Sequence, residues 1–167
     1  GNKPYNIENV SPDAHLAPSV GDSSSKTSSK AWHKIDGVCY NGSGKKVEGA
    51  ITRGMDISEW QGKINWKEAK KDLDFAFVRI SYGTRHLDDY YAYNMTEAEA
   101  ADVPVGTYVY SLAKTNKEAL AEAQLAIRQM QGHKVSYPVA FDLEDEATLG
   151  TLTRKEISQI ALTFCDE

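Results

Sequence analysis

Two carboxylates separated by one residue close a short apolar run, Tyr137-Pro138-Val139-Ala140-Phe141-Asp142-Leu143-Glu144. If this run is a β-strand, Asp142 and Glu144 lie on one face at its C-terminal end, because successive side chains alternate between the two faces. Two acids held side by side in this way are typical of a site for acid–base chemistry. The alternative is a pair of solvated loop acids in a chain that contains 24 Asp and Glu residues.

The segment 52–167 alternates between strand and helix patterns. Apolar runs predict strands, and the spacing of Asn65 to Glu68, Thr115 to Glu118 and Thr153 to Glu156 predicts helix starts with capping boxes. The expected strands are residues 53–58, 75–80, 105–110 and 137–144, and a further helix is expected over about residues 90–102. Four successive strand–helix units favour a parallel sheet in an α/β fold, and the closed form of that pattern is an eight-stranded (β/α) barrel. Only about the first four of the eight units are present.

Functional groups of a parallel barrel project from the C-terminal ends of its strands. Here the first strand ends near Asp56, and the last ends at Asp142 and Glu144. The two strands between them end at Arg79 with Tyr82 just beyond, and at Tyr108 and Tyr110. Acids gathered with aromatic rings suit the hydrolysis of a sugar polymer, because acids protonate the glycosidic oxygen and flat rings hold the pyranose faces.

Five motifs in this order resemble the glycoside hydrolase family 25 muramidases, the lysozymes of the Chalaropsis type. The motifs are Gly54-Met55-Asp56-Ile57-Ser58-Glu59-Trp60-Gln61-Gly62, Ile64-Asn65-Trp66, Phe77-Val78-Arg79-Ile80-Ser81-Tyr82-Gly83, Gly106-Thr107-Tyr108-Val109-Tyr110-Ser111, and Tyr137-Pro138 running to Asp142-Leu143-Glu144. The resemblance covers residues 52–167. It implies a muramidase that cleaves the β-1,4 bond between N-acetylmuramic acid and N-acetylglucosamine in bacterial peptidoglycan.

The resemblance also implies roles for the acids. Glu144 matches the family's catalytic acid, Asp142 would stabilise positive charge at the anomeric carbon or position the N-acetyl group, and Asp56 would lie on the floor of the cleft. Clustered negative charges raise the pKa of at least one carboxyl, which would keep Glu144 protonated near neutral pH. No cofactor or metal is implied. The family's further Asp and aromatic residues, from later strands, have no counterpart before Glu167, so we expect either a fragment or a second chain that completes the barrel.

The remaining site residues have two interpretations each. Tyr108 and Tyr110 share a face and, with Tyr82, are the candidates for substrate contact. Arg79 is a further candidate for substrate binding, and it could hydrogen-bond the acid cluster or form a purely structural ion pair. Trp60 and Trp66 are expected to pack in the core or at the rim rather than stack on sugar. Asp88, Asp89 and Asn94 are expected to organise a loop and the start of the second helix.

Two segments precede residues 52–167, the part of the chain that resembles family 25. Residues 1–31 are poor in apolar side chains and rich in Ser towards their end, which is typical of a flexible linker. Residues 32–51 predict a β-hairpin about the turn Asn41-Gly42-Ser43-Gly44, and their order of Trp, Gly and aromatic residues resembles repeats with which secreted enzymes bind cell walls. The alternative is a hairpin that only packs beside the next domain.

Composition limits the partners and the location. The chain of 167 residues has a net charge of −5, which argues against a nucleic acid partner. No apolar run is long enough to span a membrane. The linker and the resemblance imply an extracellular or wall-associated protein, and we expect its signal peptide to have been removed. Cys39 and Cys165 could form a disulfide, but a buried free thiol at Cys165 is the preferred interpretation.

Three functions remain open at this point. The first is a secreted muramidase, and the second is a fragment or pseudoenzyme that binds peptidoglycan without cleaving it. The third is another barrel glycosidase, such as a chitinase-like enzyme. Three observations distinguish them. Hydrolysis of bacterial walls indicates the muramidase, binding of walls without release of reducing sugar indicates the non-catalytic protein, and hydrolysis of chitin oligomers indicates the chitinase-like enzyme.

Overall fold

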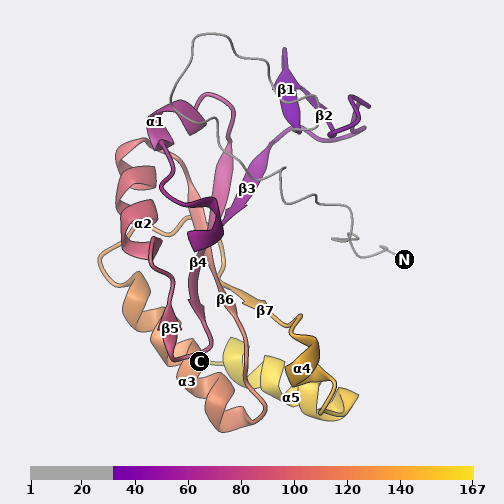
Figure 1. The fold of residues 1–167 in the computed structure, drawn as a ribbon, viewed down its shortest axis with the longest axis vertical. Coiled ribbons are helices and arrows are strands. Elements are labelled where there is room, and N and C mark those ends of the chain that lie inside the picture. The colour runs from indigo at the N-terminus through magenta and orange to yellow at the C-terminus, as the bar shows by residue number, and fades with distance from the viewer. Residues whose placement is uncertain (1–31) are drawn as a thin grey trace.

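The structure is built on four parallel strands that form one sheet (Figure 1). It is a computed structural model, and it describes residues 32–167. The linker expected over residues 1–31 lies outside the described residues. In order across the sheet, the strands are β3 (Gly54–Ile57), β4 (Phe75–Tyr82), β6 (Val105–Tyr110) and β7 (Ala140–Asp142). A two-residue strand, β5 (His86–Leu87), pairs antiparallel with the end of β4.

Helices follow the strands in turn, which confirms the predicted alternation. They are α1 (Trp66–Ala69), α2 (Tyr91–Ala100), α3 (Asn116–Met130), α4 (Glu146–Leu149) and α5 (Arg154–Cys165), with a 3-10 turn η3 (Glu59–Gln61) after β3. The side chains of Asn65, Thr115 and Thr153 accept hydrogen bonds from the third residue of their helices, so the predicted helix starts are confirmed. Helices α2 and α3 lie along one side of the sheet (Figure 1).

The core lies between the sheet and these helices. Ala76, Val78 and Ile80 of β4 are apolar and fully buried, as the side of a parallel strand covered by helices must be. Trp66 is 2% exposed, and its Nε1 donates to Asn94 Oδ1 at 3.1 Å, so the expectation that Trp66 packs in the core is confirmed. Figure 1 places α5 beside β7, and the ring of Phe164 stacks on Phe141 of that strand at 4.0 Å.

The sequence predicts an apolar stripe of Ala119, Ala123, Ile127 and Met130 on α3 and places Cys165 on the apolar face of α5. Both helical faces differ in the structure. On α3, Ile127 is 41% exposed, whereas the carboxylate of Glu122 is buried on the face of Ala119 and Ala123. On α5, Ile160 and Phe164 face the core, but Cys165 is exposed, so the prediction of a buried thiol at Cys165 is wrong. Periodicity assigned both residues to the wrong face because each lies one position beyond a buried residue, about 100° around the helix.

The fourth strand is shorter than predicted. Only Ala140–Asp142 pairs with β6, and Glu144 lies two residues beyond the strand. Pro138 has no N–H to donate to the ladder, which delays pairing at the start. At the far end the Asp145 side chain accepts the Thr148 N–H at 2.8 Å and begins α4, so the chain leaves the strand early.

The sheet does not close into a barrel within residues 32–167. Strands β3 and β7 are its two edges, and neither has a second neighbour among the described residues. The predicted (β/α) order is therefore confirmed for four strands, whereas the predicted closure of the barrel stays a prediction.

The N-terminal hairpin has a different turn from the predicted one. Strands β1 (His33–Ile35) and β2 (Val38–Tyr40) pair antiparallel about Asp36 and Gly37, whose φ angles are 49° and 79°. Positive φ at both central residues is what a tight hairpin turn requires, and Asp-Gly supplies it. The predicted Asn41 turn is also present, but it follows β2. Lys34 of the hairpin pairs with Asp74 at 2.6 Å, just before β4.

Gly106 provides a test of packing inside the sheet. A Cβ at this position would lie 2.5 Å from the ring of Phe77, the residue opposite it in register. We expect Gly106→Ala to lower the free energy of unfolding by about 1–3 kcal/mol, measured by urea denaturation. In a Phe77→Leu background, where the ring is absent, the cost should shrink. An equal cost in both backgrounds would show that the close contact is not its cause.

Candidate active site

The three predicted acids lie in one cleft of about 560 Å³. Asp56 from β3, Asp142 from β7 and Glu144 just beyond it line this cleft together with Tyr108 from β6. The rest of the lining is apolar or small: Gly54, Met55, Phe75, Phe77, Ala140 and Phe141. A cleft of this size can hold a small ligand or part of a polymer.

Strand register explains why these side chains meet. Tyr108 is opposite Ala140, and Tyr110 is opposite Asp142, so alternate residues of β6 and β7 face the same side as Asp142. Phe77, which also lines the cleft, is opposite Asp56 on one side and Gly106 on the other. The cleft therefore follows one face of the sheet towards the carboxyl ends of its strands.

The nearby carboxylates repel one another, and this repulsion acts on the pKa of Asp142. Burial raises the pKa of Asp142, the charges of Glu144 and Asp56 raise it further, and a hydrogen bond with Glu144 adds to them, so that it reaches about 6. The carboxyl whose pKa the structure raises is thus Asp142, whereas the sequence placed the retained proton on Glu144. The hydrogen bond between the two carboxyl groups gives the pair one proton to share in mildly acidic solution.

The tyrosines differ in their surroundings. Burial, the charge of Asp56 and a hydrogen bond with that carboxylate raise the pKa of Tyr108 far above its usual value, so Tyr108 stays a neutral phenol in the cleft. Burial and then the charges of Asp145 and Glu144 raise the pKa of Tyr110 to about 12. The ring of Tyr82 stacks on Tyr110 with centroids 4.8 Å apart, outside the residues that line the cleft.

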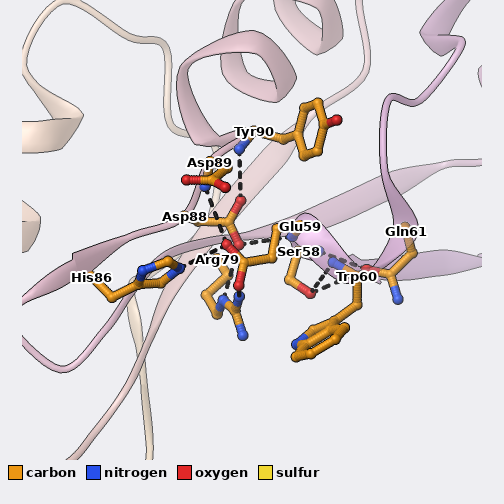
Figure 2. Close-up of polar contacts among 9 residues, drawn as sticks. All are labelled: Ser58, Glu59, Trp60, Gln61, Arg79, His86, Asp88, Asp89 and Tyr90. Atoms are coloured by element: carbon orange, nitrogen blue, oxygen red, sulfur yellow. Dashed lines mark hydrogen bonds and ion pairs between the residues drawn. The ribbon is translucent and has the colours of Figure 1, made fainter.

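Arg79 forms a buried ion pair. Its Nε lies 3.0 Å from Asp88 Oδ2 and its terminal nitrogen 3.0 Å from Glu59 Oε1 (Figure 2). Asp88 also accepts the backbone N–H of Glu59 at 2.8 Å and that of Tyr90 at 3.0 Å. The structural interpretation of Arg79 and the predicted loop-organising role of Asp88 are therefore both present in the structure.

Glu59 is the residue of this ion-pair cluster that the sequence did not identify. Its partners lie 20 and more residues away, so no local spacing indicates the pairing. Burial opposes ionisation of Glu59, but the hydrogen bond from His86, the N–H of Asp89 and the charge of Arg79 outweigh it and lower its pKa.

One group among residues 32–167 has metal-ligand character. Ligand atoms of Glu59, His86 and Asp89 lie within 4.8 Å of one another. Glu59 already pairs with Arg79, and its Oε2 lies 2.8 Å from His86 Nε2. The hydrogen bond with Glu59 and its charge raise the pKa of His86, which favours the protonated ring over the neutral ring that binds metals. Ion pairing accounts for the group, and we assign no metal to it.

The sequence profile of Glycosyl hydrolases family 25 matches residues 55–167. This match covers both strands that carry the acids and more than half of the chain. The chain belongs to glycosyl hydrolase family 25. The family identified from the five motifs is thereby confirmed, and the three acids occupy the carboxyl end of a family 25 sheet.

The family 25 chain is similar in sequence to a lysozyme and to an uncharacterized protein. It is 37% identical to Lysozyme M1 of Streptomyces globisporus over 60 residues, which cover 35% of this chain and 20% of that protein. It is 26% identical to the uncharacterized protein YegX of Escherichia coli K12 over 113 residues, 64% of this chain and 41% of that protein.

Solved structures share the fold. The modular autolysin LytC of Streptococcus pneumoniae superposes with a TM-score of 0.66 at 26% identity, over 81% of this chain and 34% of LytC. A family 25 glycosyl hydrolase from Bacillus anthracis gives a TM-score of 0.62 at 20% identity, over 81% of this chain and 58% of the other. The family 25 chain spans less than two thirds of each of these proteins. No helix among its described residues is long and apolar enough to cross a membrane.

The raised pKa of Asp142 predicts a pH-dependent stability. Because its folded-state pKa of about 6 lies above the unfolded value of 3.8, wild-type stability falls as pH rises from about 4 through 6. We expect Asp142→Asn to be more stable than wild type at pH 7, by about 1–2 kcal/mol after allowance for partial exposure, and to lose this advantage near pH 4. Urea denaturation at the two pH values measures the difference.

The matched control is Asp72→Asn, which removes an exposed carboxylate that does not line the cleft. Its effect on stability should be similar at both pH values. If Asp142→Asn behaves like this control, the carboxyl groups in the cleft do not repel one another as described.

Proposed function

We propose that this chain carries the acid residues of a muramidase that hydrolyses the β-1,4 bond between N-acetylmuramic acid and N-acetylglucosamine. The observation that carries the proposal is the meeting of Asp56, Asp142 and Glu144 in one cleft of a family 25 fold. Glycoside hydrolysis needs one carboxyl that donates a proton and another that remains negative beside the developing oxocarbenium ion. A cluster of three acids that shares a proton can supply both.

Glu144 is the proton donor in this proposal. It lies beyond the end of β7 and is exposed to the solvent side of the cleft, where a glycosidic oxygen can reach it. The hydrogen bond between Glu144 and Asp142 holds a proton beside the scissile bond. After this proton moves to the leaving oxygen, Asp142 and Asp56 are the negative charges that stabilise the positive anomeric carbon.

The tyrosines bind and orient the sugar. Tyr108 remains protonated and hydrogen-bonds Asp56, so it fixes the direction of that carboxylate in the cleft. The stacked rings of Tyr82 and Tyr110 offer a flat surface next to the acids, suited to the apolar face of a pyranose ring. Arg79 supports the site through its ion pairs with Glu59 and Asp88 and does not itself bind the sugar in this proposal.

Peptidoglycan is the proposed substrate, and the bacterial wall or the extracellular space is the proposed location. One relative is named a lysozyme, and the neighbour LytC has been solved with a synthetic peptidoglycan ligand. The hairpin of residues 32–51 would add wall contacts, because a groove of about 310 Å³ between it and β3 includes Trp32, His33 and Tyr40 and extends to Asp56.

Substitution of the proton donor is the direct test. We expect Glu144→Gln to lower the rate of hydrolysis of purified bacterial walls by at least about 100-fold, because the amide cannot donate the proton. Release of reducing sugar and loss of turbidity measure the rate. The matched control, Glu146→Gln, changes an exposed acid in the first turn of α4 and should retain wild-type activity.

Other outcomes separate the remaining functions. If Glu144→Gln hydrolyses walls at the wild-type rate, Glu144 is not the proton donor. Binding of walls by the wild-type chain without release of reducing sugar would favour a non-catalytic wall-binding function. Preference for chitin oligomers over peptidoglycan would favour the chitinase-like alternative.

The proposed mechanism also sets the direction of the pH dependence. Because Asp142 loses its proton as the pH rises through about 6, its hydrogen bond with Glu144 loses the proton that the reaction uses, and hydrolysis should slow about tenfold per pH unit above that value. Initial rates of wall hydrolysis between pH 4 and pH 9 test this. A rate that stays constant up to pH 8 would contradict a shared proton as the source of the acid.

A further inference from the structure

Trp60 is an apolar side chain without a place in the core. It is 80% exposed, which excludes the core position among the two expected for it, the core or the rim, in contrast to Trp66. It belongs to η3, a turn in which no residue is buried. Burial of apolar surface therefore explains neither the position of the turn nor the presence of an indole on it.

Polar contacts fix this turn instead. Gln61 Oε1 accepts the Ser58 N–H at 2.7 Å, and the Ser58 side chain accepts the Trp60 N–H, which forms a capping box. From outside the turn, Asp88 Oδ2 accepts the Glu59 N–H at 2.8 Å. The backbone on both sides of Trp60 is thus held by side chains that are themselves fixed.

The anchor of these contacts is the buried pair of Arg79 and Asp88. Asp88 is 4% exposed and Arg79 is 5% exposed, and Arg79 also pairs with the Glu59 side chain at 3.0 Å. Figure 2 shows the Trp60 ring to one side of this cluster, with the dashed contacts directed at the backbone and polar groups around it. The cluster thereby fixes the backbone that carries the indole, which lowers the entropy cost of binding a ligand there.

The turn lies at the edge of the sheet that carries the acids. It begins two residues after β3 ends, and Asp56 is the penultimate residue of that strand. Trp60 itself does not line the cleft. A ligand that touches both the acids and the indole must therefore extend beyond the cleft.

We propose that Trp60 is a carbohydrate-stacking residue that binds a sugar unit of the wall glycan outside the cleft, several units from the scissile bond. This proposal rests on the proposed function, because it takes the wall glycan as the ligand. Gln61, which follows the indole in the chain, has a polar amide side chain, and a pyranose ring offers an apolar face for stacking and hydroxyl groups for such a neighbour. A protein partner would need a wider apolar surface than one ring.

The test compares wall glycan fragments of two lengths. In a Glu144→Gln background that prevents cleavage, Trp60→Ala should weaken binding of an octasaccharide about five- to tenfold and leave binding of a disaccharide unchanged, as measured by calorimetry. Trp60→Phe, which keeps a flat ring, should recover most of the affinity. Leu162→Ala, which removes an exposed apolar side chain of α5, is the matched control and should bind like the parent.

Asp88→Asn tests the positioning of the indole. It removes the charge that joins Arg79 to the Glu59 N–H, so it should also weaken octasaccharide binding, and combination with Trp60→Ala should add little. Thermal unfolding and circular dichroism check that each variant is folded. If Asp88→Asn lowers the unfolding temperature but leaves octasaccharide binding unchanged, the pair of Arg79 and Asp88 has a purely structural role. That result would overturn the proposal that this pair positions the indole.

The outcomes separate this proposal from the proposed function. Binding of the octasaccharide that depends on Trp60, in a wild-type chain that releases no reducing sugar, would support the stacking site and contradict the muramidase. If the wild-type chain hydrolyses walls but Trp60→Ala leaves octasaccharide binding unchanged, the stacking site alone is overturned. The indole would then be a contact for another protein. An equal loss for both fragment lengths would also overturn it, because it would place the effect inside the cleft.

Discussion

The site depends on curvature of the sheet. Asp56 and Asp142 come from β3 and β7, the two edge strands, with β4 and β6 between them. Even so, the charge of Asp56 raises the pKa of Asp142, and both line the same cleft. In a flat sheet, side chains three strands apart would be about 14 Å apart. The twist and curl of parallel strands are what bring the edges, and with them the acids, towards each other.

Small residues on the concave face permit this curvature. A Cβ on Gly54 would lie 2.2 Å from the ring of Phe75, and one on Gly106 would lie 2.5 Å from the ring of Phe77. The rings of β4 therefore occupy the space that side chains on β3 and β6 would need, and they form an apolar floor below the acids. The rings line the same cleft as Asp142, and burial is the largest cause of the raised pKa of Asp142.

The sequence predicted the parts of the fold that depend on local order. Strand β6 has the predicted bounds, and the caps at Asn65, Thr115 and Thr153 begin helices as expected, because each signal lies within a few neighbouring residues. The family motifs likewise placed the three acids in one site. Features set by distant residues were missed: the position of Glu59 against Arg79, the exposure of Trp60, and the proton on Asp142 all depend on which strand ends meet.

Both sides of the cleft are held by buried carboxylates that act on backbone groups. On the β3 side, Asp88 accepts the Glu59 N–H just after the strand. On the β6 side, Glu122 of α3 is 2% exposed and accepts the Ser111 hydroxyl at 2.6 Å and the Leu112 N–H at 3.0 Å, while the Ser111 N–H donates to the Asp142 carbonyl at 2.9 Å. Burial of a carboxylate is costly unless hydrogen bonds satisfy it. Asp88 and Glu122 therefore hold their backbone partners within a narrow range of positions. The loops that follow the strands carrying the acids and tyrosines are therefore fixed before any substrate binds, and electrostatic stabilisation of a transition state requires that preorganisation.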